Sequence, residues 1–449
     1  MKSLTFKSAP AIKGEISVPG DKSVSHRAVM LGAIANGETI INNFLMGEDC
    51  LATIDCFRKM GVEIEIRNPY SEIRTMNVIV KGKGLKGLAK PEGILDVGNS
   101  GTTIRLISGI LAGQDFETAI TGDASIQKRP MKRISEPLLR MSARIEGREE
   151  SEGAGGSGKE IFPPLKITGN KLRPTEYELP VASAQVKSCV LLAGLYADGE
   201  TTVIEPMASR DHTERMLSYF GADIEIREDS ISVRGPADLN GSEVDVPGDI
   251  SSAAYFLVAG QIVPEADLLI RDAGVNPTRD GIIEVIRRMG GKLEVVNERI
   301  MSEEPRADIK IRNPRSEIRK LKGIEIGGEL IPRLIDEIPV IAVLATQAKG
   351  KTIIKDAKEL RVKESDRIKT ISSELRKMGA KIEEKEDGMV IEGPVKLNGA
   401  KVTSYGDHRV AMALAVAALA AEGETVIENA DCVETSFPGF ESLLKRTVA

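Results

Sequence analysis

Tryptophan is absent from this 449-residue sequence, and all aromatic residues together make up only 3% of it. So few aromatic side chains offer little surface for stacking nucleic-acid bases, and we expect no nucleic-acid partner. The cores must instead be built from aliphatic residues, alanine and glycine. Because 41% of the residues are hydrophobic, large cores can be filled, which argues against disorder over most of the chain.

Cysteine and histidine are also scarce. The four cysteines, Cys50, Cys56, Cys189 and Cys432, form no CxxC pair, and the three histidines show no HExxH spacing. So few cysteines in a large chain indicate a reduced, cytoplasmic protein. The lack of paired ligand spacings predicts that no metal is bound, and no cofactor is expected.

Long runs of one charge and long apolar runs are missing as well. The net charge is −6 without a block of one sign, so any anion site must come from local clusters of Lys and Arg. The first residues, MKSLTFKSAP, lack the apolar core of a signal peptide. The longest apolar run, 410–421, has about 12 residues and is too short to cross a membrane.

One structural pattern occurs six times along the sequence. It reads as the end of a strand, a turn, an apolar helix, a break such as Gly-Glu-Thr, and a second strand. A glycine after an apolar helix is a typical stop, and β-branched residues then favour a strand. The six copies, of which the fifth is weaker at its start, cover 18–42, 95–122, 179–205, 244–271, 335–355 and 402–428.

A second, amphipathic helix follows most copies and ends in Met-Gly or Phe-Gly before an alternating strand. Each repeat is therefore predicted as roughly β-α-β-α-β. Its first helix is apolar on nearly all sides and should be buried, while the second should lie nearer to solvent. These second helices and their strands lie in 54–66, 216–226, 283–295 and 371–383, with a looser version at 140–143.

The ends of the sequence predict how the repeats form domains. The sixth repeat stops after a short helix at 437–445 without its last strand, and we expect the N-terminal strand 3–7 to supply it. Val-Pro-Gly-Asp occurs at 18–21 and 246–249, which are the natural crossover points. This predicts one domain of 1–20 plus 247–449 and a second of 21–246, with three repeats each.

Two other interpretations concern the same organisation. An open solenoid is the ordinary reading of repeats, but the buried helices and the divided N-terminal strand argue against it. The glycine-rich segment 153–158 is predicted to be a surface loop inside the second domain, not a linker between domains.

Charged and hydroxyl side chains gather where the apolar helices begin. The start of a helix offers free N–H groups and partial positive charge, which suits phosphate or carboxylate. For a single turn, a capping Ser or Asp or a solvated charged helix start is the ordinary explanation. Several such turns in one acidic chain predict a positive pocket if the helix starts converge. The residues at these turns are Lys22, Ser23, Arg27, Asn99, Ser100, Thr102, Thr103, Arg105, Ser183, Gln185, Lys187, Asp407, His408 and Arg409. Three further clusters, at 122–130, 209–212 and 361–367, add Lys128, Arg129, Arg210, Arg361, Lys363 and Arg367.

Carboxylates occur among these cations and could act as acid and base. A carboxylate beside cations stays ionised, whereas a buried one can hold a proton. The candidates are Asp336, Glu337, Glu364 and Asp407. For Asp336, a simple helix cap is the alternative.

Seven motifs carry a resemblance to a known family. They are PGDKSVSHRA, GNSGTTIR, GDASIQKRP, SAQVKS, SRDHTE, LRVKESDRI and DHRVAMA, and they run in family order over 17–438. The chain resembles 5-enolpyruvylshikimate-3-phosphate synthases, and GDASIQKRPM, SRDHTE and PGDISSAA are closer to the glyphosate-tolerant bacterial subgroup. The resemblance implies an α/β fold of two inside-out barrel domains with three repeats each.

The resemblance also implies an activity. Such enzymes transfer the enolpyruvyl (carboxyvinyl) group of phosphoenolpyruvate to the 5-hydroxyl of shikimate 3-phosphate and release phosphate by addition and elimination. The reaction belongs to the shikimate pathway, which leads to chorismate and the aromatic amino acids. A monomer without cofactor, membrane or nucleic-acid partner is expected.

Carried over residue by residue, the resemblance assigns roles. Lys22 would contact both substrates and shuttle a proton, Asp336 would accept the proton of the attacking hydroxyl, and Glu364 would protonate the methylene and later take a proton back. Shikimate 3-phosphate would be held by Lys22, Ser23, Arg27, Ser183, Ala184, Gln185, Arg210, Asp336 and Lys363. Phosphoenolpyruvate would be held by Lys22, Asn99, Gly101, Arg129, Gln185, Arg367 and Arg409.

The chain departs from the family pattern at two positions. Thr435 stands where plant-like members have Lys, and Gly101 stands where the tolerant subgroup often has Ala, so tolerance to glyphosate does not follow.

Three rival interpretations have less support. A UDP-sugar enolpyruvyl transferase usually has a cysteine in the loop matching 122–132, a non-catalytic anion-binding protein would lack the acid–base pair, and a nucleotide-binding enzyme would need a GxxxxGK[ST] or GxGxxG motif.

Overall fold

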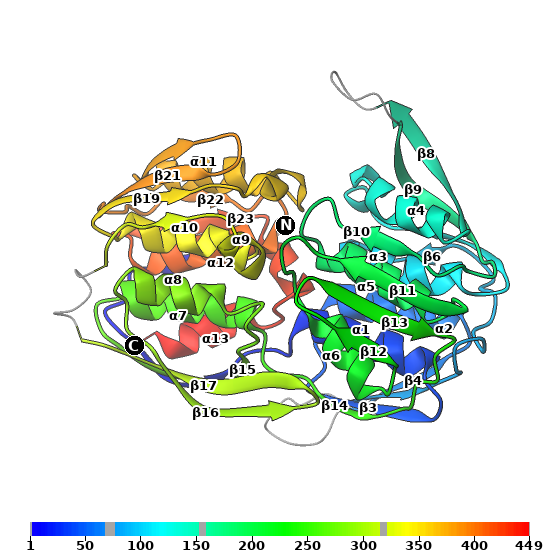
Figure 1. The fold of residues 1–449 in the computed structure, drawn as a ribbon. Coiled ribbons are helices and arrows are strands. Elements are labelled where there is room, and N and C mark those ends of the chain that lie inside the picture. Colours follow the sequence, from blue (N-terminus) through cyan, green and yellow to red (C-terminus); the bar gives the residue numbers. More distant parts are fainter. Residues whose placement is uncertain (1, 68–76, 152–158, 315–320, 449) are drawn as a thin grey trace. The chain divides into compact units, whose positions relative to one another are not determined.

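A computed structural model describes residues 2–67, 77–151, 159–314 and 321–448, so the expected loop at 153–158 lies outside the described residues. The chain divides into two compact units (Figure 1). Unit 1 comprises 1–19, 247–300 and 305–449, and unit 2 comprises 20–246 and 301–304. Among the described residues, no helix is both long enough and apolar enough to cross a lipid bilayer.

Unit 2 contains three four-stranded sheets, in the orders β14-β3-β5-β4, β6-β7-β9-β8 and β10-β11-β13-β12. The strands are β3 (Glu38–Asn42), β4 (Glu63–Arg67), β5 (Asn77–Lys81), β6 (Leu95–Asp96), β7 (Glu117–Thr121), β8 (Arg144–Ser151), β9 (Lys159–Thr168), β10 (Glu176–Glu178), β11 (Gly199–Ile204), β12 (Ile224–Ile226), β13 (Ser230–Gly235) and β14 (Glu243–Asp245).

In each of these sheets the first two strands are parallel and the remaining pairs are antiparallel. The repeat is therefore β-α-β-α-β-β, with one more strand than the sequence predicted. The extra strand, for example β5, returns to the middle of the sheet between the second and third strands. It was overlooked because a short apolar run such as NVIVK carries little periodicity of its own.

The helices of unit 2 form two groups, as the sequence predicted. In α1 (Lys22–Ile34) every residue from Val24 onward is buried, and it shares the core with α3 (Gly101–Ala112) and α5 (Ala184–Gly194). A Cβ on Gly109 would lie 2.2 Å from the carbonyl oxygen of Cys189, so α3 and α5 approach too closely for a larger residue. The outer helices are α2 (Glu48–Lys59), α4 (Lys132–Arg140) and α6 (His212–Tyr219).

Unit 1 is built on the same plan, with sheets β16-β17-β15-β2, β18-β19-β21-β20 and the three-stranded β1-β23-β22. Its strands are β1 (Leu4–Lys7), β2 (Ile12–Ser17), β15 (Ala266–Gly274), β16 (Glu294–Met301), β17 (Glu304–Asn313), β18 (Glu325–Ile326), β19 (Gly350–Ile354), β20 (Lys381–Glu384), β21 (Met389–Gly393), β22 (Lys401–Thr403) and β23 (Glu424–Glu428). The core helices are α7 (Ile250–Ile262), α10 (Ile338–Thr346) and α12 (His408–Leu419), and the others are α8 (Gly281–Arg288), α9 (Leu330–Leu334), α11 (Arg367–Lys377) and α13 (Phe440–Thr447).

The N-terminal strand completes the last repeat, as predicted. β1 pairs antiparallel with β23, and Leu4 lies opposite Ile427. The last helix begins at Phe440, however, and not at 437. Gly439 before it has φ +79°, a left-handed conformation that keeps this residue and those before it out of the helix.

The two Val-Pro-Gly-Asp segments mark an exchange of strands. β2, which precedes the first segment, pairs with β15 of unit 1, while β14, which precedes the second, pairs with β3 of unit 2. Grouping each strand with the helix that follows it was therefore wrong for the first and fourth repeats. The Asp of each segment caps the next helix, because Asp21 accepts from Val24 N at 3.0 Å and Asp249 from Ser251 N at 3.0 Å.

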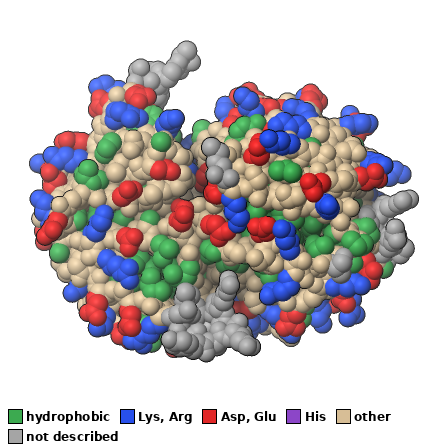
Figure 2. Space-filling view, turned by 180° about the vertical axis from the view of Figure 1, so that it is seen from behind, with side chains coloured by type: hydrophobic (Ala, Val, Ile, Leu, Met, Phe, Trp, Pro, Cys, Tyr) green, Lys and Arg blue, Asp and Glu red, His purple; other side chains and the backbone are tan. Residues whose placement is uncertain are grey.

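On the face drawn in Figure 2, acidic and basic side chains are interspersed over the surface. This distribution agrees with a net charge of −6 that is not concentrated in one stretch of the sequence.

Candidate active site

Lys22 begins α1 in unit 2 and forms an ion pair with Asp49, which lies in the first turn of α2. Both side chains are mostly buried, with 18% of Lys22 and 9% of Asp49 exposed. An ion pair between two mostly buried side chains fixes the position of the lysine. Asp49 was not among the residues singled out in the sequence, although an acidic residue in the first turn of the next helix was a usable signal.

Arg27 lies one turn after Ser23 on α1, and its guanidinium joins three segments. It donates to Thr213 Oγ1 at 2.6 Å, to Ser188 Oγ at 2.8 Å and to the carbonyl of Ser23 at 3.0 Å. Burial lowers the pKa of Arg27 to about 10, since removal from water disfavours the charged form. The groups that bond to this buried guanidinium are neutral and do not compensate its positive charge, which favours the binding of an anion.

The start of α3 brings three predicted residues together. Arg129 donates to Asn99 Oδ1 at 3.1 Å and to Ser125 Oγ at 3.3 Å, and Asn99 donates to Asp123 at 2.6 Å. Gly101 is the first residue of α3, and a Cβ there would lie 2.7 Å from Nη1 of Arg129. The missing side chain of Gly101 thus leaves room for the guanidinium.

The start of α5 is tied to the start of α3. Gln185 donates to Thr102 Oγ1 at 3.1 Å and accepts from Arg105 at 2.9 Å. Ser183 caps α5 by accepting from Val186 N at 3.4 Å, and Ala184 is the first residue of that helix. The capping explanation therefore applies to the Ser183 side chain.

Lys187 does not belong with these groups, although its place in the sequence suggested an anion-binding turn. Its side chain is 1% exposed and forms ion pairs with Glu205 and Glu214, each at 2.5 Å. Burial opposes its charge, but the two carboxylates outweigh this and raise the pKa of Lys187. Arg210, in contrast, is partly exposed between β11 and α6.

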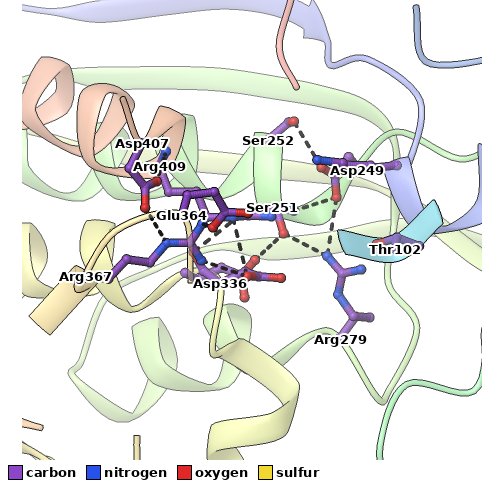
Figure 3. Close-up of polar contacts among 12 residues, drawn as sticks. Thr102, Asp249, Ser251, Ser252, Arg279, Asp336, Glu364, Arg367, Asp407 and Arg409 are labelled. Atoms are coloured by element: carbon purple, nitrogen blue, oxygen red, sulfur yellow. Dashed lines mark hydrogen bonds and ion pairs between the residues drawn. The ribbon is translucent and has the colours of Figure 1, made fainter. Parts of the chain in front are cut away.

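In unit 1, Arg367 is the centre of a cluster of carboxylates (Figure 3). Its side chain is 1% exposed, and it bonds to Asp407 at 2.8 Å, to Asp336 at 3.2 Å and also to Glu364. Burial disfavours the charge, but Asp407 and Glu364 outweigh it and raise the pKa of Arg367. Arg367 is the first residue of α11, where Asp366 caps the helix by accepting from Lys369 N.

Asp336 lies between two arginines. Its Oδ1 is 3.2 Å from Arg367 and 3.5 Å from Arg409, and its carbonyl accepts from Arg409 at 3.5 Å. It precedes α10 but does not cap it, since the cap position is Glu337 and no side-chain cap bond forms there. The capping alternative for Asp336 is therefore wrong.

Glu364 and Lys363 are neighbours in the loop before α11. The carboxylate of Glu364 is 20% exposed and that of Asp336 is 14% exposed, so both combine contact with Arg367 and access to solvent. Burial lowers the pKa of Lys363, which gives this ammonium group a reason to bind an anion. Arg361, from the same stretch, instead pairs with Asp366 at 2.8 Å and Glu384 at 3.0 Å.

Each unit thus carries part of the predicted set. Unit 2 holds cations at the starts of its core helices, and unit 1 holds arginines paired with carboxylates. That both parts act on the same molecules stays a prediction of the sequence at this stage.

The fold matches that of solved enolpyruvyl transferases. A solved structure of EPSP synthase from Acinetobacter baumannii matches with a TM-score of 0.84 and 45% identity, covering 99% of this chain and 98% of that one. The enolpyruvyl transferase NikO from Streptomyces tendae matches with a TM-score of 0.76 over 99% of this chain and 96% of that one, and at 17% identity it supports the fold alone.

Sequence comparison then gives the family. The model for EPSP synthase (3-phosphoshikimate 1-carboxyvinyltransferase) matches residues 7–444. A 3-phosphoshikimate 1-carboxyvinyltransferase of Thermoanaerobacter sp. (strain X514) is 58% identical over 96% of both chains, and one of Brevibacillus brevis is 54% identical over 98% of this chain and 99% of its own. The chain belongs to the EPSP synthase family, which confirms the predicted family, fold class and enzyme class.

Proposed function

We propose that the protein transfers the enolpyruvyl group of phosphoenolpyruvate to the 5-hydroxyl of shikimate 3-phosphate and releases phosphate. The observation that carries this proposal is the cluster in which Arg367 contacts both Asp336 and Glu364. One buried cation thereby holds two partly exposed carboxyl groups. The addition needs a base and an acid and the elimination needs a base again, and these two groups can supply them. The family assignment supports the same reaction.

The charges of the two substrates explain why so many cations are needed. Each substrate carries a phosphate and a carboxylate, and the two molecules must lie side by side against their mutual repulsion. Arginine suits both groups because its planar guanidinium can bond in pairs to carboxylate or phosphate oxygens. Orienting two reactants can itself lower the barrier by roughly 7–11 kcal/mol at best.

For shikimate 3-phosphate, we propose that the helix starts of unit 2 bind the carboxylate, the hydroxyls and the phosphate. The buried guanidinium of Arg27 and the amides that follow Ser183 support this assignment. The lowered pKa of Lys363 supports a role in binding the phosphate, whose charge would restore the protonated form. The proposed set is Lys22, Ser23, Arg27, Ser183, Ala184, Gln185, Arg210, Asp336 and Lys363.

For phosphoenolpyruvate, we propose a clamp in which arginines supply most of the positive charge. The contact of Arg129 with Asn99 and the close approach of the Arg129 guanidinium to Gly101 support this part of the assignment. The proposed set is Lys22, Asn99, Gly101, Arg129, Gln185, Arg367 and Arg409.

The proposed chemistry uses Lys22, Asp336 and Glu364. Asp336 takes the proton of the 5-hydroxyl as its oxygen attacks C2 of phosphoenolpyruvate, and Glu364 donates a proton to C3. In the elimination, Glu364 takes a proton back from C3 while the bond from C2 to the phosphate oxygen breaks. Lys22 stabilises the leaving phosphate and donates a proton to it, and the proton that Asp336 took from the hydroxyl then restores the ammonium form of Lys22. A cytoplasmic location, a monomeric state and closeness to the glyphosate-tolerant subgroup stay predictions of the sequence.

A phosphate-release assay tests the proposed function. With both substrates present we expect turnover, and with either substrate alone we expect none above background. A parallel reaction with a UDP-sugar acceptor in place of shikimate 3-phosphate should release no phosphate. Turnover with the UDP-sugar and none with shikimate 3-phosphate would contradict the proposal.

Gly101→Ala tests the proposed phosphoenolpyruvate pocket. The added Cβ would lie 2.7 Å from Arg129 and 2.9 Å from Arg105, so both guanidinium groups must move. We expect the glyphosate concentration for half-inhibition to rise about 10-fold or more, and KM for phosphoenolpyruvate to rise by a smaller factor, each 10-fold corresponding to about 1.4 kcal/mol. Inhibition curves and KM values for the two proteins measure this. Unchanged glyphosate sensitivity would refute the steric explanation.

A further inference from the structure

A second, fully buried polar cluster lies at the start of α7 (Figure 3). Ser251 is 2% exposed, Arg279 2% and Glu337 1%. The Ser251 hydroxyl donates to Oε1 of Glu337 and accepts from Nη2 of Arg279 at 2.7 Å. Arg279 also lies 3.4 Å from Asp249. These four residues come from the α7 start, the segment before α8 and the cap position of α10.

Capping of α7 does not require the Ser251 hydroxyl. Asp249 is already the cap, since it accepts from the backbone N–H of Ser251 at 3.0 Å and from the Ser252 hydroxyl at 3.2 Å. The Ser251 hydroxyl points instead to Glu337, and the other oxygen of Glu337 has no hydrogen-bond partner among the described residues. A buried carboxyl group held by one donor is costly for stability, so its presence calls for another explanation.

The position of Glu337 in the chain provides that explanation. It follows Asp336 directly, and Asp336 is held from the other side by Arg367 at 3.2 Å and Arg409 at 3.5 Å. Anchoring the Glu337 side chain therefore fixes the backbone that carries the Asp336 carboxylate. Misplacement of a reacting group by about 1 Å can lower a rate about 100-fold.

Arg409 is coupled to the same cluster. Its Nε lies 3.5 Å from Oδ1 of Asp336. Burial disfavours its charge, but Asp336, Tyr255, Glu337 and Asp249 together outweigh burial and raise the pKa of Arg409. A change at Ser251 thus reaches both the proposed base and one arginine of the proposed clamp.

We propose that Ser251 and Glu337 are positioning residues that hold Asp336 and Arg409 in place for enolpyruvyl transfer. This inference rests on the proposed function, because it assumes that Asp336 is the base. Neither residue needs to touch a substrate. Their role is to prevent the segment before α10 from shifting between substrate binding and the proton transfer.

Ser251→Ala tests the inference, with Ser252→Ala as the matched control. Both serines are buried in the first turn of α7 and both donate to a carboxylate, but the Ser252 hydroxyl bonds to Asp249. We expect Ser251→Ala to lower kcat about 10-fold, with KM for each substrate changing less than about threefold, and Ser252→Ala to keep kcat within about twofold. Equal kcat values for the two variants would overturn the proposal.

Two further variants separate positioning from folding. Glu337→Gln retains an oxygen that can accept from Ser251 and should keep kcat within about threefold, whereas Glu337→Ala should lose at least as much as Ser251→Ala. In the double variant Asp336→Asn with Ser251→Ala, we expect kcat equal to that of Asp336→Asn alone, because the serine acts through Asp336. Independent, multiplying effects would indicate a merely structural role.

The same series keeps failure of the inference distinct from failure of the proposed function. If Asp336→Asn retains near-full kcat, the assignment of the base is wrong and the positioning argument falls with it. If Asp336→Asn is slow while Ser251→Ala and Glu337→Ala are both unimpaired, only the positioning argument is wrong.

Discussion

Replacing Asp336 by Asn or Glu364 by Gln should lower kcat by about 10²–10⁴-fold, the range that general acid–base catalysis contributes. Both substitutions keep the size of the side chain but replace the carboxyl group by an amide, which cannot act as a general acid or base. Each carboxylate contacts Arg367, so its removal also frees cationic charge toward anionic substrates. We therefore expect KM for phosphoenolpyruvate to stay constant or fall while kcat collapses.

Steady-state kinetics of phosphate release with both substrates varied would measure this. Glu384→Gln is the matched control, because Glu384 is also a carboxylate of unit 1 that pairs with an arginine, Arg361 at 3.0 Å, and not with Arg367. Its kcat should stay within about twofold of the wild type, as is usual for a change at a partly exposed ion pair. If both carboxamide variants retained near-full kcat, the acid–base assignment would be wrong.

The repeated architecture could be predicted from the sequence because the core helices are apolar on nearly every side. The run at 410–421 predicted α12, which is buried along most of its length. The crossover at the two Val-Pro-Gly-Asp segments was also predicted, but the partners of strands β2 and β14 were not predictable in the same way. Their own residues do not specify a partner, which is selected by contacts between segments far apart in the sequence.

The candidate site, too, could be predicted only in part from the sequence. Arg367 and Asp336 were picked out by type and motif, and the structure places them in contact. Lys187 has the same type and a similar place at a helix start, yet it is turned into the core of unit 2 and pairs there with Glu205 and Glu214. A residue's type and spacing predict what it can bind, whereas its direction relative to the core depends on packing around the helix.

Arg367→Met should lower the free energy of unfolding of unit 1 by about 3–5 kcal/mol, the usual cost of removing one partner from a buried ion pair. Asp407 is fully buried and accepts from Nε of Arg367, so it would be left without this cation. Arg367→Lys should rescue only part of the loss, because a single ammonium group cannot bond to three carboxylates in the directions that the guanidinium reaches.

Urea unfolding followed by two probes, one for each unit, would measure the loss, since a chain of two units need not unfold in one step. Arg361→Met is the control: this arginine is 23% exposed, pairs with Asp366 and Glu384, and should change stability by about 1 kcal/mol or less. A loss confined to unit 1 and larger for Arg367→Met than for Arg361→Met is expected. Equal stability of the two variants would mean that the carboxylates around Arg367 are neutralised in another way, and the charge balance proposed for catalysis would have to be abandoned with it.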